Sequence, residues 1–173
     1  TFRDANSAKD SIWAKYDYRE VATPEGFAAN PVLVHEFYNA RRRALPDVAP
    51  NPAHVALAEL ERALAQLGGR LTLITQNVDD LHERGGSKNI LHMHGELLKA
   101  ECAGCGAVSL CEGDMSIETN CATCSRSGGM RPHVVWFGEM PRHMDDAADA
   151  IMSADLFVSI GTSGSVYPAA GFV

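Results

Sequence analysis

Four of the five cysteines form two pairs of identical spacing. Cys102 and Cys105 make one Cys-x-x-Cys pair, and Cys121 and Cys124 make the second. Each such turn can present two thiolates on one side of a tetrahedral site, so the spacing is typical of a zinc ribbon. The alternative is four buried or redox-active cysteines that share this register by chance. Because four thiolates fill the coordination shell of zinc, we expect one structural Zn²⁺ without a reactive water.

Two histidines lie two positions apart, at His92 and His94, in an apolar segment. In an extended segment both side chains would point to the same face. A His-x-His metal pair is one interpretation, although no third ligand is evident. The other is a single general base beside a structural histidine, which the ordinary pKa of imidazole suits equally well. The residues alone leave both interpretations open.

Three polar clusters follow segments that we expect to be strands of a parallel sheet, where ligands of α/β proteins bind. Residues 76–80 carry amide and carboxylate groups suited to sugar hydroxyls or a carboxamide, although an Asx-rich turn is the better interpretation for this cluster alone. Residues 161–165 are small and precede an expected helix start, which suits a phosphate. Residues 135–139 end in Gly138 and Glu139, leaving backbone groups open to a partner chain.

Helices and strands that could position these clusters follow from capping residues and periodicity. Asn30 and Asn51 each precede a proline, which predicts two helix starts, and apolar residues at helical spacing extend the second helix to Gly68. Short apolar runs at 71–75, 134–137 and 156–160 predict buried strands, with a helical stripe at residues 144–151 between the last two. Strand, helix and strand in this order favour an α/β fold with a parallel sheet.

Composition bounds the class of protein. The chain has 173 residues, 46% of them hydrophobic, which suffices for one main domain with an insertion. A net charge of -7 and a pI near 5.4 argue against a general nucleic-acid or anionic-membrane binder. No apolar run reaches the length of a membrane span, and paired cysteines favour a reducing compartment, so we expect a cytoplasmic protein. We expect the fifth cysteine, Cys111, to be a small apolar residue. The sequence starts at Thr1 without an initiator Met and stops within an expected helix, which indicates a fragment.

Several motifs, taken in order, closely resemble the sirtuins, which are NAD-dependent protein-lysine deacylases. These motifs are residues 1–4, 75–79, 81–86, 94–95, the two cysteine pairs, 137–139 and 161–163. The resemblance implies a Rossmann-like domain formed by residues 1–4, 47–98 and 131–173. It also implies a smaller domain with a helical module at 5–46 and a zinc-binding module at 99–130, NAD and acyl-lysine meeting in the cleft between. The Gly-Ala-Gly-x-Ser turn that sirtuins carry before the first motif would precede Thr1.

The resemblance also implies site roles. His94 is similar to the catalytic base, which deprotonates a ribose hydroxyl after the acyl oxygen has displaced nicotinamide. The implied NAD contacts are Phe2, Arg3, Gln76, Asn77, Val78, Asp79, Gly161, Thr162, Ser163 and Val166. The implied strand that pairs with the substrate peptide contains Val135, Phe137 and Gly138. We therefore expect acyl-lysine peptides or proteins as partners, with no nucleic acid and no membrane.

Tyr38 and Arg41 bear on the acyl group, because residues three apart share a face of the helix expected after Asn30. A phenol and a guanidinium together can bind a carboxylate. The alternative is a solvated basic face, which Arg42 and Arg43 would extend. With a small Ala22 upstream, the Tyr-x-x-Arg pair resembles the sirtuin subclass that removes succinyl and malonyl groups, with acetyl as a weaker substrate.

Two other functions fit parts of this pattern. A catalytically silent, zinc-bearing module could bind acyl-lysine peptides without cleaving NAD. A mono-ADP-ribosyltransferase would cleave NAD and transfer ADP-ribose to the peptide instead of to the acyl group. The presence of a base, ribose contacts and a peptide strand in one sequence favours the deacylase.

Overall fold

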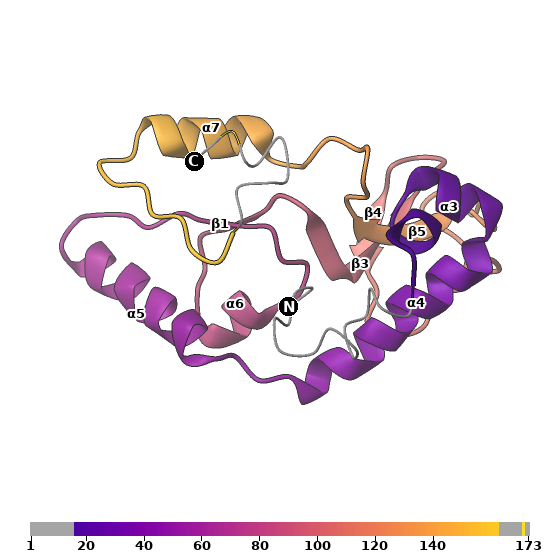
Figure 1. Cartoon of the computed structure of the whole chain (residues 1–173), viewed down its shortest axis with the longest axis horizontal. Coiled ribbons are helices and arrows are strands. Elements are labelled where there is room, and N and C mark those ends of the chain that lie inside the picture. Colours follow the sequence, from indigo (N-terminus) through magenta and orange to yellow (C-terminus); the bar gives the residue numbers. More distant parts are fainter. Residues whose placement is uncertain (1–15, 163–170, 172–173) are drawn as a thin grey trace. The chain divides into compact units, whose positions relative to one another are not determined.

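The computed structural model describes residues 16–162 and 171 (Figure 1). Four expected NAD contacts, Phe2, Arg3, Ser163 and Val166, lie outside the described residues. The chain divides into two compact units. The first unit comprises Thr1–Ala49 and Glu96–Gly138, and the second comprises Pro50–Gly95 and Glu139–Val173. The division expected from the sequence, into a Rossmann-like domain with helical and zinc modules, stays a prediction.

The helical part of the first unit contains α2 (Tyr18–Val21), α3 (Pro24–Ala29), α4 (Pro31–Ala44) and the 3₁₀ helix η1 (Leu45–Asp47). The predicted start of α4 is confirmed. Asn30 Oδ1 accepts a hydrogen bond from Leu33 N at 3.1 Å, and Pro31 occupies the first turn. Thr23 caps α3 in the same way by accepting from Gly26 N at 2.9 Å.

The remainder of the first unit is a three-stranded sheet and the loops that carry the cysteines. The sheet has the order β4 (Val108–Leu110), β3 (Gly95–Cys102), β5 (Met130–Val134), with β3 and β4 antiparallel. A small core of Ala100, Cys102, Met115, Cys121 and Met130 lies beside it. Few apolar residues fill this core, so the expectation that metal organises this part of the chain agrees with its packing.

Helix α4 is attached to the cysteine-bearing part by two buried polar side chains. Asn39 donates to Met115 O at 2.8 Å and accepts from Met115 N at 3.0 Å. Arg42 donates to Leu97 O at 3.1 Å, to Gly113 O at 3.0 Å and to Asn39 Oδ1 at 2.8 Å. Because these groups are buried, losing their partners would leave costly unsatisfied donors. The zinc-bearing loops therefore help to hold α4.

The second unit contains α5 (Pro52–Gln66), β1 (Leu73–Thr75), α6 (Leu81–Gly85), β2 (Ile90–His92) and α7 (Met144–Met152). The Asn51 cap of α5 is confirmed as a capping box, in which His54 Nδ1 accepts from Asn51 N at 3.1 Å. Strands β1 and β2 are parallel and joined through α6, which confirms an α/β arrangement. The register pairs Thr75 with His92, so the polar residues after β1 lie near the end of β2.

Two of the strands predicted from the sequence are not formed as predicted. Residues 156–160 form no strand and are exposed, Leu156 by 78% and Ile160 by 65%. A strand needs a hydrogen-bonding neighbour, and within residues 16–162 no strand pairs with this run. The run at 134–137 also forms no strand of the parallel sheet, because β5 ends at Val134 and Trp136 is buried by aromatic contacts instead.

Among the described residues, no helix combines the length and apolar character that crossing a membrane requires.

Candidate functional site

The four predicted cysteine ligands come together in the first unit. Their sulfur atoms all lie within 4.8 Å of one another, and Cys102 and Cys124, like Cys105 and Cys121, are 3.7 Å apart. A tetrahedral zinc with Zn–S bonds of about 2.3 Å requires sulfur atoms about 3.8 Å apart. The arrangement therefore fits one zinc ion held by four thiolates.

Backbone amides donate hydrogen bonds to two of these four sulfur atoms. In each Cys-x-x-Cys turn the N–H two positions on donates to the first sulfur at 3.4 Å, from Gly104 to Cys102 and from Thr123 to Cys121. Hydrogen bonds from the N–H groups of Cys124 and Thr123 lower the pKa of Cys121 to about 6. A thiolate is the form that binds zinc, so these donors favour the metal-binding form of Cys121. Cys111 lies outside this cluster and packs against the small core, as expected.

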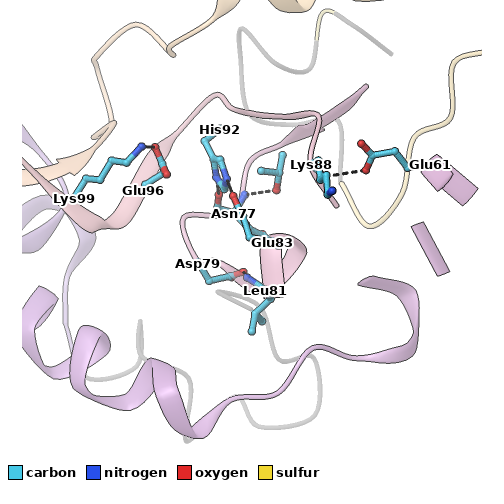
Figure 2. Close-up of polar contacts among 10 residues, drawn as sticks. Glu61, Asn77, Asp79, Leu81, Glu83, Lys88, His92, Glu96 and Lys99 are labelled. Carbon is cyan, nitrogen blue, oxygen red and sulfur yellow. Dashed lines mark hydrogen bonds and ion pairs between the residues drawn. The ribbon is translucent and has the colours of Figure 1, made fainter. Parts of the chain in front are cut away.

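A loop after β1 carries the predicted ribose and nicotinamide contacts. Thr75 Oγ1 accepts from Asn77 N at 3.0 Å, and Asp79 Oδ1 accepts from Leu81 N at 3.2 Å at the start of α6 (Figure 2). Asp79 thus forms the Asx turn that was the alternative interpretation of this cluster. Gln76 Nε2 donates to Thr162 Oγ1 at 3.2 Å, which joins this loop to the polar cluster predicted at residues 161–165. Val78, in the same loop, is buried.

His94 lies in the turn between β2 and β3 and faces the same loop. Its Nδ1 is 3.1 Å from Gln76 O. A carbonyl oxygen only accepts, so Nδ1 carries the proton and Nε2 is the basic nitrogen of the neutral ring. Burial lowers the pKa of His94, and the Gln76 carbonyl opposes that shift. At neutral pH the ring is therefore uncharged and can take up a proton.

His92 makes different contacts from His94. Its Nε2 is 2.6 Å from Glu83 Oε1, and its Nδ1 is 3.4 Å from Asn77 O. Within residues 16–162, His94 belongs to no cluster of three or more His, Cys, Asp or Glu side chains that could hold one metal ion. The structure therefore does not support a His-x-His metal pair. The sequence left His92 without a role, and no motif signalled its pairing with Glu83.

Tyr38 and Arg41 both belong to α4 of the first unit, three residues apart. The hydroxyl of the buried Tyr38 accepts from Trp136 Nε1 at 3.0 Å. The guanidinium carbon of Arg41 lies 4.4 Å from the centroid of the Phe37 ring. Burial lowers the pKa of Arg41 to about 10, with the nearby Tyr38 raising it in part. The guanidinium stays charged at neutral pH in a partly desolvated setting, where an anionic ligand would be bound more strongly than in water.

The neighbouring arginines do not extend this pair into a solvated basic face. Arg42 is buried and bonded to backbone carbonyls, as described above. Arg43 is exposed and pairs with Asp114 at 2.5 Å. Arg41 alone of the three combines partial burial with an aromatic surface, and its role in binding a carboxylate stays a prediction.

The predicted peptide-pairing segment lies beside Ala22. Phe137 N donates to Ala22 O at 3.0 Å, and the ring of Phe137 packs against Tyr18 at 4.9 Å between centroids. The amide of Phe137 is therefore used within the chain, while Gly138 is exposed with a φ of 92°. Ala22 is buried.

Sequence reasoning missed two residues that support the Tyr38–Arg41 pair. Phe37 is four residues before Arg41, so helical spacing could have identified it. Trp136 is 98 residues from Tyr38, and no local pattern signals that contact.

A model of the Sir2 family matches residues 1–168. The NAD-dependent protein deacylase of Caulobacter vibrioides is 61% identical over 173 residues, covering 100% of this chain and 71% of that protein. The enzyme of the same name from Yersinia pseudotuberculosis is 56% identical over 175 residues, covering 100% of this chain but only 60% of its own length.

Solved structures agree with these relatives. A Sir2 homolog–NAD complex has a TM-score of 0.83 at 41% identity, covering 99% of this chain and 65% of that one. Sir2Af2 bound to a myristoylated histone peptide has a TM-score of 0.65 at 35% identity. This match covers 89% of this chain and 66% of that one. The fold, the four-cysteine zinc site and the relatives agree, and the chain belongs to the Sir2 family.

Proposed function

We propose that this protein is an NAD-dependent protein-lysine deacylase that favours acyl groups ending in a carboxylate. Succinyl-lysine and malonyl-lysine would be its preferred substrates and acetyl-lysine a weaker one, with nicotinamide and O-acyl-ADP-ribose as products. The relatives named NAD-dependent protein deacylase support the reaction. The observation that carries the acyl preference is the charged, half-buried Arg41 beside Tyr38.

The polar groups of the second unit fit NAD as a co-substrate. Bound NAD would supply the glycosidic bond whose cleavage releases nicotinamide. Gln76 and Asn77 would bind the ribose, and Val78 and Asp79 would line the nicotinamide pocket. Gly161 and Thr162 would contact the remainder of NAD. The hydrogen bond between Gln76 and Thr162 supports this assignment, because ribose hydroxyls can replace either partner in it.

His94 would accept the proton of a ribose hydroxyl at Nε2. The Gln76 carbonyl fixes the proton on Nδ1 and orients the ring. A neutral, oriented imidazole is the form that general-base catalysis requires.

In the first unit, Arg41 and Tyr38 would bind the acyl carboxylate, and Ala22 would leave room for the acyl chain. Trp136 supports this role, because its N–H donates to the Tyr38 oxygen and holds the phenol in place. Val135, Phe137 and Gly138 would contact the peptide backbone. Since Phe137 N is already bonded to Ala22 O, the peptide would use other backbone groups of this segment.

The direct test of the proposal is a mass-spectrometric assay of the full-length protein with NAD and succinyl-, malonyl- and acetyl-lysine peptides. We expect peptide with an unmodified lysine side chain, together with O-acyl-ADP-ribose. Both products should form fastest from the succinyl and malonyl peptides. ADP-ribose attached to the peptide would instead identify a mono-ADP-ribosyltransferase. Peptide binding without any cleavage of NAD would identify a non-catalytic binding module.

Replacing Arg41 with methionine should change acyl selectivity. We expect kcat/KM for succinyl-lysine to fall about 10- to 100-fold, the usual range for losing a hydrogen bond to a charged group. Activity on acetyl-lysine should fall less than threefold, roughly the level of an ordinary packing change. Steady-state kinetics on matched succinyl and acetyl peptides would measure both.

The matched control for this change is Arg43→Met. Arg43 is two residues further along α4 and pairs with Asp114 at the surface. It should leave the ratio of succinyl to acetyl activity unchanged, because exposed ion pairs contribute little. Equal losses on both substrates in Arg41→Met would contradict the carboxylate-binding role.

The pH dependence of the reaction should report the lowered pKa of His94. A base with a lowered pKa remains neutral to lower pH, and its activity is lost as pH falls through that value. We therefore expect the midpoint of the acidic limb of kcat/KM to lie below about pH 6.5, the ordinary imidazole value. A midpoint above about pH 6.5 would show that the hydrogen bond to Gln76 changes the pKa of His94 more than burial does, and it would contradict this prediction.

A further inference from the structure

Both histidines of the His-x-His segment face the loop that carries Gln76 and Asn77. His94 Nδ1 lies 3.1 Å from Gln76 O, and His92 Nδ1 lies 3.4 Å from the next carbonyl, Asn77 O. Figure 2 shows His92 between Asn77 and Glu83. The two rings thus contact successive carbonyls of one loop, but only His92 also contacts a carboxylate.

This difference bears on the charge of His92. A carbonyl oxygen and a carboxylate both accept hydrogen bonds, so a ring with one at each nitrogen satisfies both only when both nitrogens carry protons. That form is the imidazolium. The side chain of His92 is 8% exposed and that of Glu83 is 41% exposed. Burying the positive charge is costly unless a partner compensates it, and Glu83 at 2.6 Å supplies that partner.

The charge state of Glu83 agrees with this pairing. Burial alone would raise the pKa of Glu83, but the hydrogen bond from His92, a backbone hydrogen bond and the charges of His92 and His82 together lower it. The carboxylate is therefore ionised at neutral pH and can balance His92.

We propose that His92 is a positioning residue for NAD, charged through its ion pair with Glu83. The imidazolium donates to Asn77 O and fixes the loop whose Gln76 and Asn77 side chains would bind the ribose. The role in NAD binding rests on the function proposed above. The charge of His92 rests only on its contacts with Asn77 and Glu83. His92 touches neither NAD nor the reacting atoms in this scheme, so it acts through Asn77.

The charge of His92 is tested directly by NMR of protein labelled with ¹⁵N in the histidine rings, at neutral pH and without NAD. We expect His92 to have two protonated ring nitrogens and His94 to have one, on Nδ1. In Glu83→Gln the His92 signals should move to those of a neutral ring, because an amide oxygen accepts a hydrogen bond without supplying a charge. Neutral His92 in the unaltered protein would overturn the proposal.

The positioning role is tested by kinetics and by calorimetric NAD binding to the full-length protein. Glu83→Gln should raise the KM and the Kd for NAD about tenfold, in the range for losing a hydrogen bond to a charged group, while kcat changes less than about twofold. Glu83→Asp, which keeps the charge, should recover most of the affinity. The KM for the acyl peptide should not change.

The matched control is Glu61→Gln, the same substitution near the other end of β2. Glu61 accepts from Lys88 N at 3.0 Å and from Asn89 N at 2.9 Å, as Figure 2 shows for Lys88. We expect it to lower the unfolding temperature about as much as Glu83→Gln without altering the Kd for NAD. Equal effects of both variants on NAD affinity would reduce His92 to a structural role and overturn the proposal.

Calorimetry separates this proposal from the proposed function, because it needs no turnover. If the unaltered protein binds NAD but releases no deacylated peptide, the deacylase assignment fails while the Glu83→Gln comparison still decides the positioning role. If deacylation proceeds and Glu83→Gln binds NAD normally, only the positioning role fails.

Discussion

Replacement of His94 with asparagine should lower kcat for deacylation by about 10²- to 10⁴-fold, the usual contribution of a general base. Asparagine can still donate to the Gln76 carbonyl, but it offers no basic nitrogen in place of Nε2. Acyl-peptide affinity should change little, because the side chains proposed to bind the acyl group belong to α4. Rates of O-acyl-ADP-ribose formation and peptide affinity by fluorescence anisotropy would separate the two effects.

His143→Asn is a suitable control for this prediction. His143 is an exposed histidine before α7 that contacts Asp146 at 2.9 Å, and its φ of 55° is one that asparagine tolerates. The activity of the His143→Asn variant should match that of the unaltered protein. Undiminished NAD-dependent deacylation by His94→Asn would remove His94 from the proposed mechanism.

Removal of zinc should abolish activity on every acyl group, together with loss of folded structure in the first unit. Structural zinc sites contribute about 10–16 kcal/mol of apparent binding free energy, which becomes folding free energy. The cysteine loops also hold α4 through Asn39 and Arg42, so their loss would release Tyr38 and Arg41. Chelation followed by near-UV circular dichroism, deacylation assays and zinc determination would measure the three effects together.

Specific variants make the zinc prediction sharper. Cys121→Ser should lose the metal and the near-UV signal, whereas Cys111→Ser should retain one zinc per chain and normal activity, because Cys111 lies outside the cluster. Readdition of zinc to the chelated protein should restore structure and activity in parallel. A chelated protein that stays folded and loses only kcat would indicate a catalytic metal and contradict the structural role.

Local sequence patterns predicted the helix starts and the cysteine cluster well. A cap such as Asn30 acts on an N–H three residues away, and a Cys-x-x-Cys turn sets its own geometry. Helical spacing likewise places Tyr38 and Arg41 on one helix, while their shared binding role stays a prediction. Each of these features depends on interactions within a few residues, which a sequence displays directly.

Features that depend on distant partners were not predictable in this way. The apolar run at 156–160 has the composition of a buried strand, yet strand formation also requires a neighbour to pair with, and composition does not supply one. The run at 134–137 looks like a strand for the same reason, but Trp136 is bonded to Tyr38 instead. The Glu83–His92 pair is also invisible to spacing rules, because α6 and β2 bring it together.

The attachment of α4 to the cysteine-bearing loops has a consequence for how the sequence can vary among relatives. Asn39 and Arg42 reach this part of the chain through main-chain atoms of Leu97, Gly113 and Met115. These contacts use main-chain atoms, so among the three positions they exclude only proline at Met115, whose N–H donates to Asn39. Sequence drift in the loops therefore need not be matched by compensating changes in the helix. The attachment of α4 therefore restricts the side chains at Asn39 and Arg42 more than those at Leu97 and Gly113.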